Sequence, residues 1–453
     1  MALDLLVSGP MHRFPILALC AGLLLAPRAF AAEVTNVADA MDERHPLEVD
    51  LAVSGTHQRR ETRITREQAT AGGILIVDEL HHLRTVDELG FRLGVGLWHD
   101  LELHVSAPLV LRDSQELRYA DVNGVSVEGV STLKNNHLDV SGCGGPGRCA
   151  QSGPASPIVA PGESRRSGFR DPTVGIAWGP INEERELRLR PELYPEGHPV
   201  STWVIGFDYT LPLVPQDDPS RFGAALPTGV SPGAEGRKAH VFTLWTAFSK
   251  RYRVLEPYFR FSGSVPLATN SSYDNCAHPE LLSDVGTANC AGSWKGQTAY
   301  HPAPQGGFEL GAELVAAEDR KADERLSFDV RAGASYHGPG RDYTQVTDAL
   351  GKLQATDDFL AAQGSLGVYG RLARFFHAKL EATLGFETAH YLTHEDIGAD
   401  KSGDGKISIS AGSGRPAPDQ NPNYDFRLDQ IGRRLRAEPS LLWGVSGTLS
   451  LDF

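Results

Sequence analysis

Charged side chains occupy alternate positions of several short segments whose other positions are apolar. In "GFELGAELV", Glu309 and Glu313 alternate with Phe308, Leu310 and Leu314. Because a β-strand sends successive side chains to opposite faces, such a segment has one charged face and one apolar face. Read by this parity, the charged faces carry Glu48, Asp50, Arg92, Glu102, His104, Asp208, Arg260, Glu309, Glu313, Asp329, Arg331, Arg371, Lys379 and Glu381. Enclosed in a barrel, these residues would form either a paired network or a polar constriction that favours cations, since acids outnumber bases.

Nucleophilic chemistry has one candidate pair on these faces. His104 and Ser106 lie two residues apart on the same side of one segment, which a histidine base and a serine nucleophile require. The sequence offers no third residue to orient the histidine, and such a pair is common by chance. We therefore expect no enzyme, and we keep an outer-membrane hydrolase as an alternative.

A calcium-loop pattern occurs near the C-terminus, in "DKSGDGKIS". Asp400, Ser402 and Asp404 match ligand positions 1, 3 and 5 of such a loop, and Gly405 matches the glycine of position 6. The twelfth position holds Ala411 instead of the usual glutamate. The sequence thus permits a calcium site in a loop, and an ordinary Asp-Gly turn explains the pattern equally well. No other cofactor is expected.

The N-terminal region resembles a secretory signal. The apolar run from Phe14 to Ala26 is too short to span a bilayer, and Ala29-Phe30-Ala31 supplies a small-x-small cleavage pattern. We expect residues 1–31 to be removed. In an exported protein the four remaining cysteines predict two disulfides, Cys143 with Cys149 and Cys276 with Cys290.

The mature chain, residues 32–453, alternates with period two along its length. About twelve strands of roughly ten residues are recognisable, which is the length of a tilted transmembrane β-strand. Short turns alternate with long connections, which cover 55–86, 113–170, 215–239, 268–304, 338–358 and 390–439. One connection, 180–199, is too long for its place, and its "ELRLRPEL" would raise the count to fourteen if it were strand.

This layout predicts an all-β fold, a single up-and-down antiparallel barrel in the outer membrane. The short turns would be periplasmic and the long loops extracellular, with both cysteine pairs on the oxidising side. Trp98, Trp178 and Trp203 fall at strand ends, where interfacial aromatics belong. A soluble β-sandwich or lipocalin-like barrel would also alternate, but its apolar faces would point inward. The formal charge of −14 argues against a nucleic-acid partner, because basic residues are nowhere concentrated enough to follow a phosphate backbone.

Two stretches resemble a known family. "GLWHDLELHVSAPLVL" (96–111) and "SGFRDPTVGIAW" (167–178) are similar to a hairpin and a strand start of the outer-membrane transporter-like family linked to phenol meta-cleavage pathways, although Arg170 replaces a glycine of its pattern. "LPTG" (226–229) and "IGRR" (431–434) are also similar. The resemblance implies a barrel channel for hydrophobic or aromatic compounds, with no catalytic residues. The terminal Phe453 resembles the C-terminal signal that the barrel assembly machinery reads.

Three functions remain open at this point. The first is an outer-membrane channel for small solutes, embedded in lipid. The second is a structural or adhesive barrel whose large loops bind partners, and the third is the barrel hydrolase. An aromatic-lined open passage would favour the first.

Overall fold

The computed structural model describes residues 32–38, 40, 47–127, 162–194, 198–221, 233–282, 287–319, 324–373, 375–409, 417–425 and 427–453. The expected signal peptide (1–31) and the Cys143–Cys149 pair lie outside these residues. Among them, no helix is long and apolar enough to cross a membrane.

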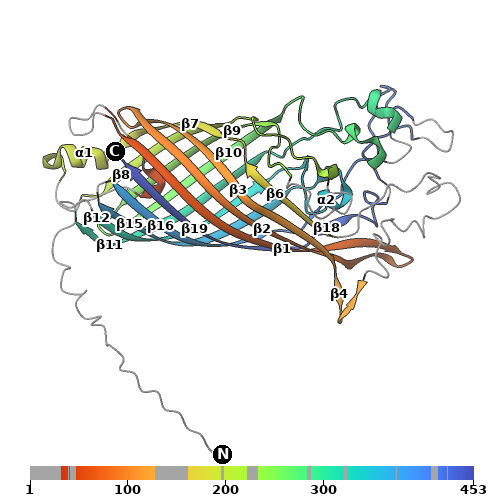
Figure 1. Ribbon diagram of the computed structural model, residues 1–453, viewed down its shortest axis with the longest axis horizontal. Coiled ribbons are helices and arrows are strands. Elements are labelled where there is room, and N and C mark those ends of the chain that lie inside the picture. The colour runs from red at the N-terminus through yellow and green to blue at the C-terminus, as the bar shows by residue number, and fades with distance from the viewer. Residues whose placement is uncertain are drawn as a thin grey trace, which may run out of the picture.

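Twelve long strands form one closed antiparallel barrel (Figure 1). Each pairs with its neighbours in chain order, and β1 pairs with both β2 and β19. The strands are β1 (Val49–Thr70), β2 (Gly73–Trp98), β3 (Leu101–Tyr119), β7 (Thr173–Asn182), β8 (Val200–Thr210), β9 (Ala239–Arg251), β10 (Leu255–Ala268), β11 (Gln305–Asp319), β12 (Glu324–His337), β15 (Phe359–Ala373), β16 (Phe376–Glu387) and β19 (Ser440–Asp452). The predicted fold class and the count of twelve are confirmed.

Short elements complete the structure. β6 (Glu163–Phe169) continues the β7 side of β3. The others are β4 (Asp121–Val122), β5 (Val125–Ser126), β13 (Gly340–Asp342), β14 (Gln354–Thr356), β17 (His390–Tyr391), β18 (Leu435–Ala437), α1 (Glu183–Leu189), α2 (Thr347–Leu350), and the 3-10 turns η2 (Glu33–Thr35), η5 (Pro191–Leu193), η6 (Pro219–Arg221), η7 (Asn275–Ala277), η8 (Pro279–Leu281) and η9 (Thr287–Ala291).

The last residues of the chain close the barrel by pairing with β1. The Val49 amide donates to the Phe453 carbonyl at 3.1 Å, and the Phe453 amide donates to the Val49 carbonyl at 3.0 Å. From Asp50 opposite Asp452 to Glu61 opposite Leu441, β1 and β19 pair without interruption. A closed barrel has no free edge, so backbone groups are satisfied in lipid.

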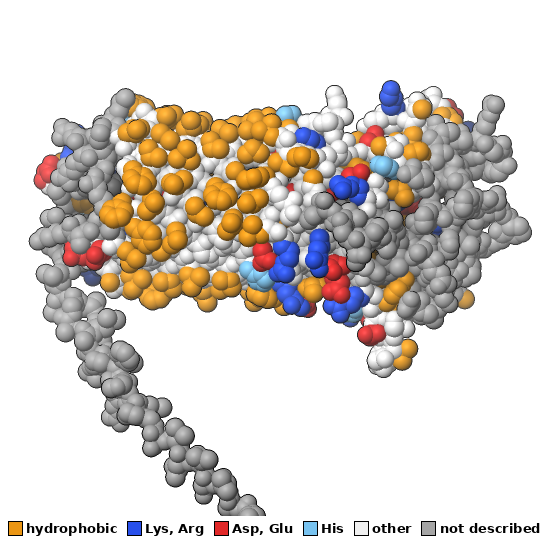
Figure 2. All heavy atoms as spheres, in the orientation of Figure 1, with side chains coloured by type: hydrophobic (Ala, Val, Ile, Leu, Met, Phe, Trp, Pro, Cys, Tyr) orange, Lys and Arg blue, Asp and Glu red, His pale blue; other side chains and the backbone are white. Residues whose placement is uncertain are grey.

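An apolar belt covers the face of the barrel that Figure 2 shows. Its side chains are outward-facing and exposed on every long strand, for example Leu93, Phe207, Leu310, Leu366 and Leu384. The alternative of a soluble barrel with inward apolar faces is therefore wrong. Trp98, Trp178 and Trp203 are exposed at the short-turn end, as predicted, and β3 places Leu101 opposite both Trp98 and Trp178.

The 180–199 connection contains a helix instead of extra strand. All seven residues of α1 are Glu, Arg or Leu, which are good helix formers. The Asn182 side chain caps the helix by accepting a hydrogen bond from the Arg185 amide at 3.0 Å. The prediction of a possible fourteen strands is therefore wrong.

The predicted loop 55–86 is also wrong, because β1 and β2 run through it as one long hairpin. Residues 113–119 and 163–169 of the predicted 113–170 loop are likewise strand, in β3 and β6. Ile64, Leu80 and Leu117 on the inner face of this wall are buried in a hydrophobic core with α2 and β18. Outside the membrane, this wall is therefore stabilised by a hydrophobic core like that of a soluble protein. The prediction missed it because it assumed strands of about ten residues, the length that spans the membrane.

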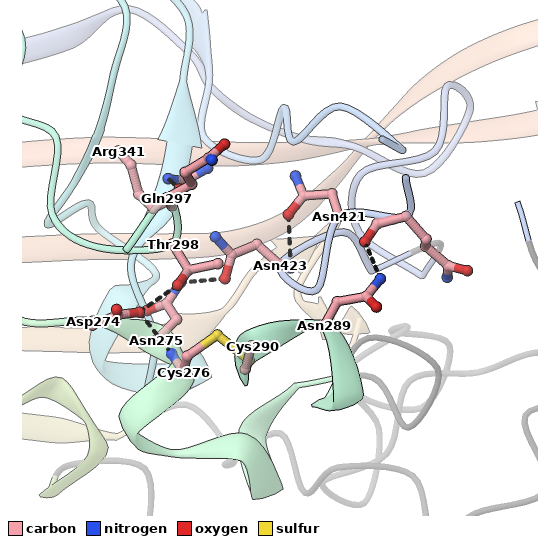
Figure 3. The surroundings of a disulfide bond; sticks show 11 residues. Asp274, Asn275, Cys276, Asn289, Cys290, Gln297, Thr298, Arg341, Asn421 and Asn423 are labelled. Carbon is pink, nitrogen blue, oxygen red and sulfur yellow. Dashed lines mark hydrogen bonds between the residues drawn. A yellow bond between two sulfur atoms is a disulfide. The ribbon is translucent and has the colours of Figure 1, made fainter. Parts of the chain in front are cut away.

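We call the assembly of this wall with the long connections the cap. A disulfide joins Cys276 to Cys290 there, as predicted, with an S–S distance of 2.02 Å (Figure 3). Beside it, the Asn275 side chain donates to the Leu353 carbonyl and to Asn423, both at 3.0 Å. Asn289 donates to the carbonyls of Ala417 and Gln420. These hydrogen bonds attach the connection that carries the disulfide to two other long connections.

Candidate functional site

The charged faces predicted from parity meet inside the barrel. A cavity of about 500 Å³ near the short-turn end is lined by Glu48, Asp50, Arg92, Glu102, His104, Asp208, Arg260, Glu313, Asp329, Arg331 and Lys379. Of the other predicted residues, Glu381 bonds to Arg331 in the same network and Glu309 lines a second cavity. Arg371 lies on β15 in register with Arg325 and His377.

One network joins β1, β2, β3 and β8. Arg92 bridges Asp50, at 2.8 Å, and Glu102. His104 lies between two carboxylates, with Nδ1 3.1 Å from Glu102 and Nε2 2.8 Å from Asp208. Both ring nitrogens thus face carboxylate oxygens, and this arrangement does not position His104 as a base for Ser106.

A second network joins β10, β12 and β16. The Tyr258 hydroxyl donates to Asp329 at 2.7 Å, and Arg331 lies 3.6 Å from the same carboxylate. Arg331 also bonds to Glu381, which Lys379 approaches at 3.1 Å. Both acids of this network, Asp329 and Glu381, thus have a cationic partner in the interior.

Trp245 of β9 extends the first network along the wall to β10. Its indole Nε1 donates to Asp208 at 2.9 Å, and the Arg260 guanidinium lies 4.7 Å from the ring centroid. Trp245, Tyr258 and Tyr369 bring aromatic surface to a cavity that is otherwise charged. Parity could have identified Trp245, since it alternates with Leu244 and Thr246 on β9.

The N-terminal segment, residues 32–38, lies inside the short-turn end. Val34, Asn36 and Ala38 line the cavity beside the strands. The Ala38 amide donates to Glu102 at 2.9 Å, and the Thr35 and Ser249 hydroxyls are 3.0 Å apart. The segment therefore narrows the lumen. Residues 32–38 show neither strand alternation nor a motif, so this placement could not be predicted from the sequence.

Two further cavities lie toward the long-loop end. One of about 350 Å³ is lined by residues of β10, β11, β12, β15, β16 and β19, including Arg260, Glu309, Gln363 and Leu442. The other, of about 600 Å³, is lined by residues that include Arg84, Glu88, Arg170, Thr173 and Arg237. Arg260 also lines the first cavity, and so does Thr173.

The arginines of the third cavity are each held by acids. Arg84 makes two hydrogen bonds with Asp113, at 2.9 and 2.6 Å. Arg170 pairs with Glu88 at 2.5 Å and with Glu235 at 3.3 Å. Sequence reasoning missed this cluster because it assigned Arg84 and Arg170 to the ends of loops.

The Asp400 loop satisfies its carboxylates with backbone donors. Asp400 accepts the amides of Gly403, Asp404 and Gly405, and these hydrogen bonds, the Gly405 bond first, lower its pKa below the ordinary value. Asp419 accepts the Ser402 and Ser408 amides in the same way. Among the described residues, no three metal-binding side chains converge. Calcium binding at Asp400, Ser402 and Asp404 therefore stays a prediction.

Comparison with known proteins gives distant likenesses. No protein-family model and no curated protein matches the chain. An outer-membrane channel from Pseudomonas putida F1 is 11% identical, with a TM-score of 0.36, over 87% of this chain and 95% of that one. A Pseudomonas aeruginosa FadL homologue is 10% identical, with a TM-score of 0.32, over 90% of each chain. The outer-membrane protease OmpT from Escherichia coli is 8% identical, with a TM-score of 0.26, over 90% of this chain and 96% of that one.

Likeness at this level says nothing about what this chain transports or cleaves. The architecture of the barrel indicates which membrane the protein occupies. An even number of antiparallel strands, closed on themselves and surrounded by an apolar belt, is the architecture of bacterial outer-membrane proteins. The chain is an outer-membrane β-barrel.

Proposed function

We propose that this barrel is a channel for small solutes. The chain would be exported by a signal peptide of residues 1–31 and assembled by machinery that reads the C-terminal strand ending in Phe453. The long-loop end would face outward, which puts the Cys276–Cys290 disulfide on the oxidising side of the membrane.

The observation that carries the proposal is the continuity of the cavities. The cavity near the short-turn end shares Arg260 with the second cavity and Thr173 with the third. The three spaces therefore border one another along the barrel interior. A barrel that served only as an anchor would gain stability by filling this volume with side chains.

The lining suggests small aromatic molecules with a polar substituent as the first solutes to test. The faces of Trp245, Tyr258 and Tyr369 offer apolar surface, and the surrounding charges offer partners for hydroxyl or carboxylate groups. The sequence resemblance to transporter-like proteins of aromatic degradation supports the same class. Because acids outnumber bases among the predicted lining residues, cations would pass more readily than anions.

Solute flux into proteoliposomes tests the proposal. We expect phenol and small cations to enter faster than into protein-free liposomes. Arg260→Gln should change the flux, since Arg260 borders two cavities, whereas Arg59→Gln, on the outer wall of the cap, should not. Flux equal to that of protein-free liposomes would refute the proposal.

A second candidate function rests on the cap. Its hydrophobic core and disulfide give the long-loop end a defined shape of its own, as a partner-binding surface requires. In that case, binding of cells or polymers would depend on the cap, while the flux would stay at the background level. The hydrolase alternative receives no support from the His104 geometry, and loss of a measured hydrolase activity in Ser106→Ala would be needed to revive it.

A further inference from the structure

The backbone nitrogen of Ala32 ends the N-terminal segment in a buried acidic site. It donates to the Oε1 atom of Glu256, the second residue of β10. Ala32 is fully buried and Glu256 is 1% exposed. This nitrogen belongs to the peptide bond at which the small-x-small pattern predicts cleavage.

Glu256 lies in a group of buried charges. The guanidinium of Arg325 is 3.7 Å from Glu256 and 2.5 Å from Glu313, so these two carboxylates share Arg325. All three side chains are at most 3% exposed. Because a buried carboxylate is stable only when charged or hydrogen-bonded groups surround it, a further cation beside Glu256 would be favourable.

We propose that Glu256 is the binding site for the α-amino group that signal-peptide removal creates. Hydrolysis of the Ala31–Ala32 bond adds one water, leaves a carboxylate on Ala31 and gives Ala32 an amine that takes up a proton. The single amide donor then becomes an ammonium with three donors, and its hydrogen bond to Glu256 becomes charge-assisted on both sides. This inference rests on the export assumed in the proposed function.

The ion pair would hold the N-terminal segment across the lumen. At one end Ala32 is bound by Glu256 of β10, and at the other the Ala38 amide is bound by Glu102 of β3. Between them, Val37 packs with Ala177 and Val204 of β7 and β8 and with Trp245 of β9. Three strands therefore separate the two anchors around the wall. Maturation would fix a strap over the short-turn end, and loss of either anchor would free it.

Amine reactivity tests the site directly. The exported protein is purified from outer membranes, its N-terminus is determined by mass spectrometry, and acetylation of that amine is followed in the folded barrel. We expect Ala32 as the first residue. We expect its acetylation to be at least about tenfold slower than in Glu256→Gln, because a buried amine reacts only after local opening. Glu309→Gln, which changes a lumen carboxylate of another cavity, is the matched control and should react like the wild type.

A second variant tests the site even if Glu256→Gln does not fold. Insertion of Gly-Ser between Ala31 and Ala32 leaves every side chain in place but moves the new amine away from Glu256. It should acetylate as fast as the unfolded chain. The proposal is overturned if the mature chain begins elsewhere, or if the wild-type amine reacts as fast as in the insertion variant. Neither result depends on solute flux, so a barrel that conducts nothing would refute the channel without deciding this site.

Discussion

Strand β1 has apolar residues on its outer face near the short-turn end and charged residues on its outer face in the cap. Near the short-turn end its outward residues are Leu51 and Val53, exposed to lipid, while Asp50 faces the lumen. In the cap its outward residues include Arg59, and the inward Ile64 is fully buried. Figure 2 shows the change, where the apolar belt gives way to charged side chains.

The position of a residue along β1 determines which face its side chain occupies, whereas the surroundings of that face determine whether the side chain is apolar or charged. Side chains alternate between the two faces throughout, because the strand geometry does not change. What changes is the solvent on the outer face, from lipid to water. The cap therefore buries apolar residues as a soluble domain does, whereas the membrane part exposes them and buries charge.

The largest expected effect comes from a charge that the cap does bury. Arg166 is 2% exposed and bonds to Asp217 and Asp348. Arg166→Met leaves both carboxylates without this partner and should destabilise the cap by about 3–5 kcal/mol. Arg165→Gln, at the neighbouring exposed position, should have no measurable effect. Hydrogen exchange of cap amides measures both, and equal protection in the two variants would contradict the assignment of Arg166 to a buried network.

The cap core should be nearly as sensitive. Leu435 is fully buried against Ile64 and Leu80. Leu435→Ala should cost about 2–5 kcal/mol in cap stability, since it removes apolar contacts and leaves a cavity. Leu384→Ala, on the lipid-facing side of β16, should cost less because lipid fills the space. Thermal unfolding in lipid compares the two, and a larger loss for Leu384→Ala would reverse the proposed distinction.

Adding a charge should have opposite consequences in the two regions. Leu310→Arg in the apolar belt should destabilise the barrel by about 2–4 kcal/mol, because lipid does not solvate the guanidinium. Thr85→Arg, outward-facing in register with Arg59 on the cap wall, should be tolerated. Urea unfolding from lipid vesicles measures the difference. If Leu310→Arg unfolds at the same urea concentration as the wild type, the belt does not face lipid.

The cap should also respond to pH, because two of its carboxyls have pKa shifts of opposite sign. Burial, reinforced by Glu395 and opposed by Lys352, raises the pKa of Asp429 to about 7. For Glu67, burial is outweighed by hydrogen bonds from Arg434, Tyr391 and the Gly432 amide, and its pKa falls to about 2.

The stability that Asp429 contributes to the cap is therefore lost as pH rises from 3.8 to about 7. The stability that Glu67 contributes is lost as pH falls from 4.5 to about 2. Asp429→Asn should remove the first dependence and Glu67→Gln the second. Cap hydrogen exchange, corrected for the intrinsic pH dependence, measures both slopes. An unchanged slope in either variant would show that another group titrates there.

The alternation of residues predicted which face of a strand each side chain occupies. It did not predict whether the outer face meets lipid or water. Parity placed Glu102, His104 and Asp208 in one lumen, and it could also have placed Trp245. It failed for Arg84 and Arg170, because a wall that is polar outside and apolar inside does not look like a membrane strand. It had no means of placing Ala32, whose position depends on a contact with Glu256 that lies 224 residues away.

Single-channel conductance in planar bilayers tests the central claim most directly, which is that water and small solutes pass through the lumen beside the N-terminal segment. We predict small, discrete steps for the mature wild-type barrel and larger steps after deletion of residues 32–38, since these residues narrow the short-turn end. If neither the wild-type protein nor the deletion variant gives steps, although both migrate as folded barrels on unheated gels, the lumen is closed and the account is contradicted.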